Sequence, residues 1–514
     1  MTSTFTSDII RPDEIERYLE GGADFIDEEL IHRTLAENRA PDRVRVRDIL
    51  AKSKNIETLT PAETAALLHV DDPELLEEMR ATALEVKLKV YDNRIVTFAP
   101  LYMSNHCVNN CAYCGFRSEN TAMVRRKLSM EEVAAETRAL TGTHGHKRLI
   151  VVYGEHPESD IDYITESIDT VYRQSVETKG GHSCIRRVNV NAAPMPIEHL
   201  RRLPEVGIGT FQVFQETYHR DTYRRVHGTQ HLKSDYRWRL YAMHRAMEAG
   251  IDDVGIGALF GLYDWRFEVL GLLLHSRELE RRFDGIGPHT ISFPRLEPAQ
   301  NAPATTETRY RVDDADFLKL VTVLRLAVPY TGMICTAREP AAIRDKTVYR
   351  GVTQMDASTR IGIGAYSEED GDGETGRRDA PHDGRRDAPH DGRQHEDRQQ
   401  FMLGDTRSLD ELIRDMAQQG FITSFCTAGY RIGRTGERIM HLLRSCKEGH
   451  FCKLNAVLTF REWLDDFATG ETRRIGEELI RRELGSLAFN GEAQRRQFDD
   501  YYRRTSAGER DLYI

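Results

Sequence analysis

The chain has 514 residues, of which 39% are hydrophobic and 30% are charged, and its formal net charge is −11. This composition excludes a wholly disordered chain, and the negative charge disfavours nucleic acid or an anionic membrane as the main partner. No basic segment followed by an apolar stretch opens the chain, and no run of about 18 apolar residues occurs. We therefore expect a cytoplasmic protein whose eight cysteines are thiols or metal ligands rather than disulfides.

The first part of the chain, residues 1–88, is predicted to be a helical extension. Apolar residues recur with helical spacing in 11–16, 49–54 and 61–79, and acidic residues precede them. Thr60 followed by Pro61 is typical of a helix start, because proline is tolerated at the first helical position.

From residue 95, short apolar runs alternate with amphipathic stretches. The runs predict strands at 95–103, 148–153, 187–191, 210–215, 253–259, 289–294, 332–336 and 351–358. Helical patterns lie between them, among others at 130–140, 197–203, 235–249, 266–281 and 314–327. Strands that alternate with helices indicate an α/β fold, here a (β/α)₈ barrel of the TIM type over residues 89–368.

The segment 369–400 interrupts this alternation. Residues 376–383 are repeated at once in 384–391, and large apolar side chains are nearly absent. Such a segment cannot bury enough apolar surface to order itself, so we expect a disordered linker. Metal binding by its histidines is the alternative. The remainder, 401–514, is predicted to be a small C-terminal domain that ends in a charged helical tail.

Three cysteines with the spacing C-x₃-C-x₂-C lie in the segment 105–115: Cys107, Cys111 and Cys114. Three thiolates from one short loop can hold three irons of a [4Fe–4S] cubane and leave the fourth iron open to chelate a ligand. A structural zinc site is the alternative, but it usually needs four ligands in paired knuckles, and no second knuckle follows. The motif directly follows the first predicted strand, where barrel enzymes place their active sites.

This motif, with Tyr113 before its third cysteine, resembles the signature of the radical S-adenosylmethionine (radical-SAM) enzymes. The stretch 99–111 is similar to the tyrosine-lyase branch of that family. Further similar stretches favour the [FeFe]-hydrogenase maturases of the HydG type, relatives of the 2-iminoacetate synthase ThiH: 187–194, 214–220, 252–264, 287–295 and 328–334. The resemblance spans roughly residues 20–470 apart from the repeat.

The resemblance implies a carbon–carbon lyase with a (β/α)₈ barrel, a [4Fe–4S] cluster and S-adenosylmethionine. Its substrate would be L-tyrosine, cleaved between Cα and Cβ to p-cresol and dehydroglycine. An electron donor such as ferredoxin or flavodoxin and hydrogenase maturation proteins would be its partners. Dehydroglycine would then be converted to carbon monoxide and cyanide for maturation of the hydrogenase H-cluster.

The resemblance also implies cofactor-binding roles for individual residues. Tyr113 would lie near adenine, Gly154 and Glu155 would contact the methionyl amino group, and Glu216 would accept from the ribose hydroxyls. Arg239 would grip the methionine carboxylate with two hydrogen bonds. Without the resemblance, Gly154 and Glu155 would form a plain turn. Glu216 would be a solvated acid at a strand end, and Arg239 would be an arginine on a helix surface.

Three residues after the last two predicted strands are candidates for holding the tyrosine carboxylate: Arg338, Ser358 and Arg360. Guanidinium and hydroxyl groups orient an amino acid well. For Arg338, an ion pair with Glu339 or Asp356 is the alternative.

The C-terminal stretches 424–438 and 451–459 resemble a second cluster-binding domain of the maturases, with the pattern C-x₂-C-x₂₂-C. Cys426 and Cys452 match its first and third cysteines, but residue 429 is glycine. Cys446 could substitute, two thiolates could act with another ligand, or no second cluster forms. The resemblance implies that His289 binds an extra iron beside that cluster. A purely structural role for this histidine is the alternative.

This departure puts the formation of carbon monoxide and cyanide in question, but not tyrosine cleavage. Two other functions stay open. The first is a 2-iminoacetate synthase that delivers dehydroglycine to thiamine thiazole biosynthesis. The second is a non-catalytic iron–sulfur carrier, which needs no cofactor pocket and so would not require the acidic and basic residues named above.

Overall fold

The computed structural model describes residues 2–367 and 399–514, so the predicted repeat linker lies almost entirely outside the described residues. Before the first strand, the described chain is helical: α1 (Thr2–Ile9), α2 (Asp13–Glu16), α3 (Glu28–Glu37), α4 (Arg43–Lys54), α5 (Pro61–Leu68) and α6 (Pro73–Tyr91). The predicted start of α5 is confirmed, because Thr60 and Glu63 each accept a backbone N–H from the other in a capping box.

Eight parallel strands form a closed barrel, which confirms the predicted fold. They are β1 (Arg94–Ser104), β2 (Arg148–Tyr153), β5 (Arg187–Asn191), β6 (Phe211–Gln212), β7 (Val254–Gly257), β8 (Thr290–Ser292), β9 (Gly332–Cys335) and β10 (Gln354–Asp356). Each strand pairs with the next, and β10 pairs back with β1 through Val96–Gln354 and Phe98–Asp356. All eight predicted strands are present, although β6 is much shorter than the predicted 210–215.

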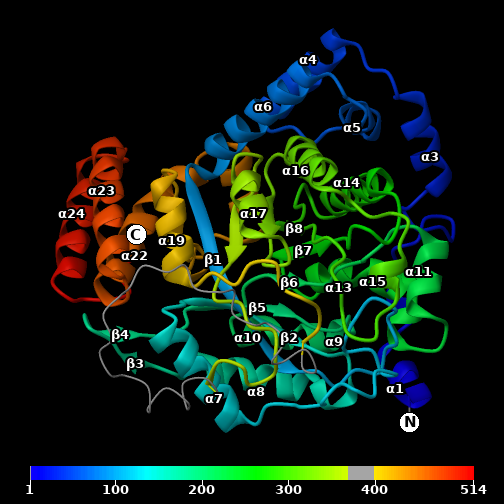
Figure 1. Cartoon of the computed structure of the whole chain (residues 1–514), viewed down its shortest axis with the longest axis horizontal. Helices are drawn as coiled ribbons and strands as arrows, with labels where there is room; N and C mark the ends of the chain where they lie inside the picture. The colour runs from blue at the N-terminus through cyan, green and yellow to red at the C-terminus, as the bar shows by residue number, and fades with distance from the viewer. Residues whose placement is uncertain (1, 368–398) are drawn as a thin grey trace, which may run out of the picture.

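Helices surround the barrel between its strands (Figure 1). The predicted helices 266–281 and 314–327 are α14 (Trp265–Arg282) and α16 (Asp314–Ala327). The predicted helix 235–249 is instead two, α12 (Tyr236–Leu240) and α13 (Ala242–Glu248), because Tyr241 between them leaves the helical conformation. The remaining elements up to residue 367 are α7 (Met130–Arg138), η1 (Ala139–Thr143), η2 (Pro157–Ser159), α8 (Ile161–Tyr172), β3 (Val176–Glu177), β4 (His182–Ser183), α9 (Ile197–Leu200), α10 (Arg202–Glu205), α11 (Arg220–His227), η3 (Leu232–Ser234), α15 (Ala304–Glu307) and α17 (Ala341–Val348).

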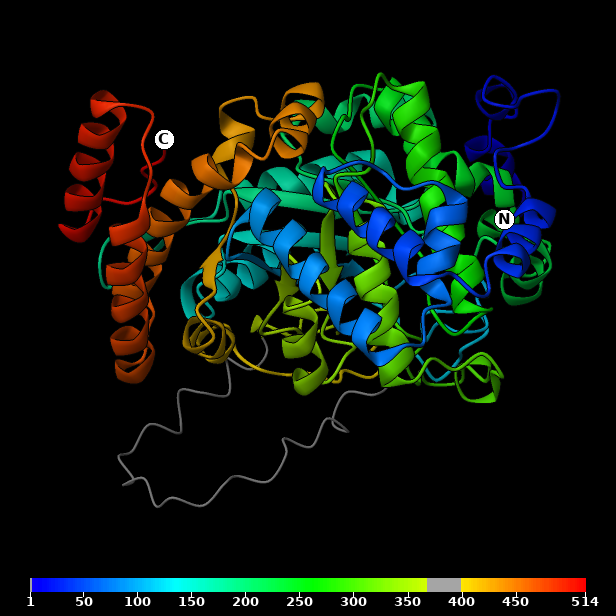
Figure 2. The same cartoon turned by 90° about the horizontal axis from the view of Figure 1, so that it is seen from above.

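The C-terminal part is continuous with the barrel sheet. Its strand β11 (Ile422–Ser424) pairs in parallel with the start of β1, from Arg94–Ile422 to Val96–Ser424. Its helices are α19 (Leu409–Gln418), α20 (Ala428–Arg431), α21 (Gly436–Arg444), α22 (Glu448–Asp466), α23 (Gly470–Ser486) and α24 (Glu492–Ser506). In both views α24 and α3 lie on opposite sides of the barrel (Figures 1 and 2). Within the described part of the chain, no helix is long and apolar enough to cross a membrane.

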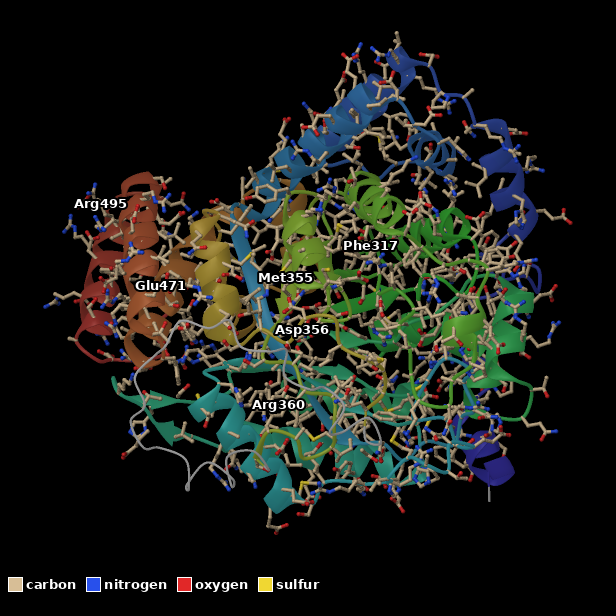
Figure 3. All side chains as sticks on the ribbon, viewed as in Figure 1. Phe317, Met355, Asp356, Arg360, Glu471 and Arg495 are labelled. Carbon is tan, nitrogen blue, oxygen red and sulfur yellow. The ribbon has the colours of Figure 1, made fainter. Side chains whose placement is uncertain are left out.

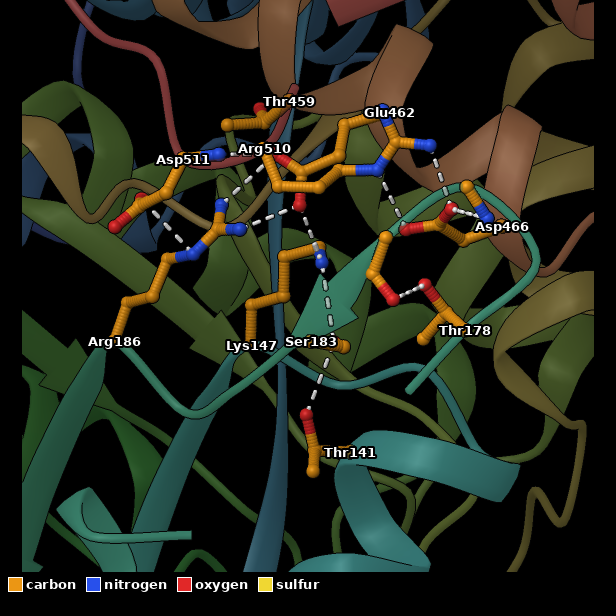
Figure 4. A network of polar contacts seen from close by, with 12 residues as sticks. Thr141, Lys147, Thr178, Ser183, Arg186, Thr459, Glu462, Asp466, Arg510 and Asp511 are labelled. Atoms are coloured by element: carbon orange, nitrogen blue, oxygen red, sulfur yellow. Dashed lines mark hydrogen bonds and ion pairs between the residues drawn. The ribbon is translucent and has the colours of Figure 1, made fainter. Parts of the chain in front are cut away.

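A buried polar network attaches α22 to the barrel (Figure 4). Glu462 lies 2.8 Å from Lys147 Nζ and also pairs with Arg186, and all three side chains are nearly inaccessible to solvent. Arg186 in turn pairs with Asp511 at 2.9 Å. Burial would raise the pKa of Glu462, but Lys147 and Arg186 outweigh it and lower that pKa to about 2. The C-terminal helices are therefore held against the segments that lead into β2 and β5.

Candidate active site

One cavity opens at the carboxyl ends of the barrel strands. The loop after β1 contributes Cys107, Cys111 and Cys114 to its lining, and the loop after β9 contributes Arg338. The cavity is also lined by Tyr113, Gly154, Glu155, Glu216, Lys233 and Arg239. The fold thus gathers residues from across much of the barrel into one site, as expected for this architecture.

The cysteine loop is held by backbone hydrogen bonds to three distant segments. Val108 N donates to Glu155 O at 2.8 Å, Ala112 N to Val226 O at 2.9 Å, and Gly115 N to Gln400 O at 3.0 Å. The loop is therefore fixed along its length, and its thiols need little rearrangement to bind a metal cluster.

The three thiols fit an iron–sulfur cluster with one open iron. Cys111 is 5% exposed, and burial raises the pKa of Cys107 to about 11 and that of Cys111 further. Cys107 and Cys111 would be protonated as free thiols, so metal binding must displace their protons. Among the described residues that line the cavity, there is no fourth cysteine, and the donor set matches three irons of a cubane.

Two carboxylates and two cations alternate beside the thiols. Arg239 Nη1 lies 2.7 Å from Glu155 Oε1, and Lys233 Nζ lies 2.7 Å from Glu216 Oε1. Asn109 Nδ2 donates to the other oxygen of Glu155 at 2.6 Å. Burial would raise the pKa values of Glu155 and Glu216, but Arg239 and Lys233 outweigh it and lower both. Charged carboxylates and cations in one buried group can bind the ammonium and carboxylate of an amino acid.

Lys233 was missed by sequence reasoning. It lies in η3, outside every family-like motif, and its role as the partner of Glu216 depends on a contact over 17 positions of sequence. A single lysine in a loop carries no signal that predicts such a contact.

Backbone geometry explains two further predicted residues. Glu216 has φ +69°, a left-handed conformation that costs a non-glycine residue about 1–3 kcal/mol and concentrates at functional sites. A Cβ at Gly154 would lie 2.1 Å from the carbonyl oxygen of His106, so only glycine allows this close approach. Tyr113 turns its ring to the cavity while its hydroxyl bonds His227 Nε2 at 2.8 Å.

Arg338 extends into the cavity with its guanidinium 3.3 Å from the ring centre of Phe401. The alternative ion pairs are not observed, because Glu339 pairs with Arg295 and Asp356 pairs with Arg344. In the described part of the chain, no carboxylate forms a salt bridge with Arg338. Its guanidinium is therefore available to a carboxylate ligand.

Ser358 and Arg360 are not among the residues that line the cavity, and their role in holding the tyrosine carboxylate stays a prediction. Ser358 has φ +49°, and its Oγ accepts the N–H of Leu409 at 2.9 Å. Arg360 donates to Ala365 O at 2.9 Å, in the loop beyond Asp356 (Figure 3). The residues that face the cavity here are Thr359 and Ile361, because this irregular loop does not follow the alternation of β10.

Outside this lining, His106, His156 and Glu158 place ligand atoms within 4.8 Å of one another. However, His156 Nδ1 accepts the N–H of Glu158 at 3.2 Å, so that nitrogen is occupied. Lys127 Nζ donates to the carbonyl oxygen of Glu158 at 2.7 Å and adds a positive charge. This group fits a polar cluster better than a cation site.

The residues predicted for a second cluster lie at the opposite, amino end of the barrel. The carbonyl oxygen of Cys426 accepts from Arg148, the first residue of β2, at 3.3 Å. A hydrogen bond from Cys452 lowers the pKa of Cys426 well below its ordinary value, and Arg148 and His289 assist against burial. His289 Nδ1 lies 3.8 Å from Asp253 Oδ1. The structure thus brings two thiols together near one imidazole.

Position 429 has room for a side chain, but its glycine offers no side-chain ligand for a metal. Gly429 lies in α20, and a Cβ built there would meet only Arg434 Cβ, at 3.8 Å. Burial raises the pKa of Cys446, and the charged group beside that thiol is Lys89. Cys446 lies in the turn between α21 and α22, and its role as a substitute ligand stays a prediction.

Comparisons with known proteins agree with this geometry. Residues 101–270 match the radical SAM superfamily, and residues 292–422 match the biotin and thiamin synthesis associated domain. The 2-iminoacetate synthase of Escherichia coli (strain K12) is 28% identical over 319 residues, which cover 62% of this chain and 80% of that protein.

Two crystal structures are similar over nearly the whole chain. HydG of Carboxydothermus hydrogenoformans, an [FeFe]-hydrogenase maturase, is 37% identical, with a TM-score of 0.74, over 92% of this chain and 98% of that one. Another HydG, described as a maturase of the [FeFe]-hydrogenase, is 43% identical, with a TM-score of 0.86, over 96% of this chain and 100% of that one. A relative this similar over its full length shows that the chain belongs to the HydG family of radical-SAM enzymes, which use a [4Fe–4S] cluster and S-adenosylmethionine.

Proposed function

We propose that this protein is a tyrosine lyase that cleaves the Cα–Cβ bond of L-tyrosine to p-cresol and dehydroglycine. The observation that carries the proposal is the cavity itself. It brings three thiols, one buried and two half-buried, into the same lining as an arginine that forms no salt bridge with a carboxylate of the described residues. This is the arrangement needed to generate a radical beside a bound amino acid.

Cys107, Cys111 and Cys114 would hold the cluster, and Glu155, Glu216 and Arg239 would hold S-adenosylmethionine. When bound, these two groups supply a radical that removes a hydrogen atom from the substrate. The surrounding residues exclude water, since Cys111, Tyr113 and Glu155 are each less than a tenth exposed. A dry cavity prevents quenching of the radical and strengthens every charge contact within it.

Arg338 would orient tyrosine through its carboxylate. A guanidinium can donate two parallel hydrogen bonds to a carboxylate, which fixes both position and direction. The Phe401 ring packs against one face of that guanidinium and limits its freedom. A low-potential donor such as ferredoxin or flavodoxin would supply the electron, and hydrogenase maturation proteins would be the downstream partners.

The test is anaerobic turnover of the reconstituted protein with dithionite, S-adenosylmethionine and tyrosine. We expect p-cresol in proportion to the 5′-deoxyadenosine released. Turnover with tryptophan but not with tyrosine would refute the substrate. Absence of any 5′-deoxyadenosine would instead favour an iron–sulfur carrier.

A second function, 2-iminoacetate synthase, is favoured by one specific observation: Gly429 offers no ligand for a second cluster. In that case the reaction ends at dehydroglycine, which hydrolyses to glyoxylate in water. Glyoxylate in amounts equal to p-cresol, without carbon monoxide, would support this function. Carbon monoxide at comparable yield would support the maturase function.

A further inference from the structure

The short segment 399–404 lines the cavity and bridges the loops that follow β1 and β9. Gly115 N, beside the cysteine loop, donates to Gln400 O at 3.0 Å. Gly404 N donates to Ala337 O, in the loop after β9, at 2.8 Å. Gln400 and Phe401 lie between these anchors and line the cavity. We call this segment, residues 399–404, the roof of the site.

Two glycines let this roof approach so closely. A Cβ at Gly115 would lie 2.7 Å from the carbonyl oxygen of Gln399, and a Cβ at Gly404 would lie 2.4 Å from that of Arg338. Both contacts are with backbone atoms, which cannot turn aside as a side chain could. Close contacts between main-chain atoms therefore fix the position of the roof at both of its ends.

The side-chain amide of Gln400 has a defined orientation. Tyr102 Oη donates to Gln400 Oε1 at 3.0 Å. With Oε1 accepting from Tyr102, the amide turns Nε2 toward Cys114 Sγ at 3.5 Å. A sulfur that ligates iron has no proton to donate, so the N–H side of the amide is the one that suits this contact. An N–H donor from 286 positions away in the sequence is therefore aimed at one of the three sulfurs of the cysteine loop.

We propose that Gln400 is a positioning residue that sets the reduction potential of the cluster bound through Cys114. The inference rests on the proposed binding of that cluster to the three thiols. A hydrogen bond to a cluster sulfur stabilises the reduced, more negatively charged state and so raises the potential. The contact is half-buried, so it is less screened than a hydrogen bond in open water and acts more strongly on the sulfur.

The same roof also contacts Arg338. Phe401, the next residue, packs against the Arg338 guanidinium at 3.3 Å. One short segment thus contacts both a sulfur of the cysteine loop and the arginine proposed to hold the substrate. Loss of the Gln400 amide alone should change the first contact and leave the second.

The experiment is a redox titration of the reconstituted protein, followed by electron paramagnetic resonance of the reduced cluster. Gln400→Leu removes the donor, and we expect a more negative midpoint potential with unchanged iron content. Gln400→Glu keeps the acceptor for Tyr102 but replaces the donor by a charged oxygen, so its shift should be larger in the same direction. Tyr102→Phe removes only the orienting bond and should give the smallest shift of the three.

Met402→Ala is the matched control, because this side chain is 51% exposed and lies in the same segment. Its midpoint should equal that of the wild type. The proposal is overturned if Gln400→Leu and Gln400→Glu hold a full cluster with the wild-type midpoint. If the midpoints shift as expected but tyrosine yields no p-cresol, the proposed substrate fails and the role of Gln400 stands.

Discussion

The two ends of the barrel both gather cysteines, but they do so in different ways. At the carboxyl end, three thiols come from one loop of the chain, after β1, and line one cavity. At the amino end, Cys426 and Cys452 come from separate segments that meet only because α22 is attached to the barrel. The first site is local and complete, whereas the second depends on tertiary contacts and lacks a donor at Gly429.

This difference shows how a site assembled from several segments can lose a ligand while its shape survives. The backbone around Gly429 leaves space for a side chain, and the pair of Cys426 and Cys452 is intact. The fold of the C-terminal part therefore does not depend on the third thiol. We expect only metal binding at this site to depend on it.

The largest expected effect is at the first site. Cys111→Ala leaves two thiolates, too few to hold a cubane with an open iron, so cluster binding and 5′-deoxyadenosine release should both be lost. Iron analysis and chromatography of the anaerobic reaction measure these. Cys184→Ala is the control, because Cys184 does not line the cavity and belongs to neither cysteine motif. Release at the wild-type level from Cys111→Ala would refute the ligand assignment.

At the second site, we expect a substitution to increase the iron content of the protein. The wild type should hold one stable cluster, about four irons per chain, with the second substoichiometric, and Gly429→Cys should add up to about four more irons. Carbon monoxide release, captured by deoxy-haemoglobin, should rise while the p-cresol yield stays similar. Two full clusters and tyrosine-dependent carbon monoxide in the wild type would show that the third thiolate is dispensable.

The attachment of the second site should depend on Glu462. Glu462→Gln leaves Lys147 as a buried charge without its carboxylate partner and leaves Arg186 with Asp511 alone, which should cost about 3–5 kcal/mol of stability. The folded pKa of Glu462 is about 2, below its ordinary 4.5. Its contribution is therefore complete above about pH 4.5 and is lost as the pH falls toward 2.

Thermal unfolding between pH 3 and pH 7 measures this effect. The wild type should lose stability with acid more steeply than Glu462→Gln. Glu471→Gln is the control, since the side chain of Glu471 is 61% exposed. Parallel pH profiles for wild type and Glu462→Gln would contradict the assignment.

The smallest expected effect separates two arginines that sequence reasoning grouped together. Arg338→Ala should weaken tyrosine binding by about 1.5–3 kcal/mol, the value of a hydrogen bond to a charged group, or roughly 10- to 150-fold in half-saturation. Arg360→Ala should leave the tyrosine dependence unchanged, because Arg360 lies outside the cavity lining. Equal effects of the two variants would move the carboxylate site elsewhere.

The sequence by itself determined the barrel and the cysteine loop. A short apolar run predicts a strand from local sequence alone. The spacing of Cys107, Cys111 and Cys114 likewise places three thiols in one loop, whatever surrounds that loop. The capping box at Thr60 and the missing donor at Gly429 are local facts of the same kind.

Only the tertiary structure decided which distant residues share a cavity. It placed Lys233 beside Glu216 and Gln400 beside Cys114, and it kept Ser358 and Arg360 out of the lining. It also joined β11 to β1, which sets the second pair of thiols at the amino end of the barrel. The physical reason is that sequence periodicity specifies which face of an element is buried, whereas a contact between segments depends on how those elements pack.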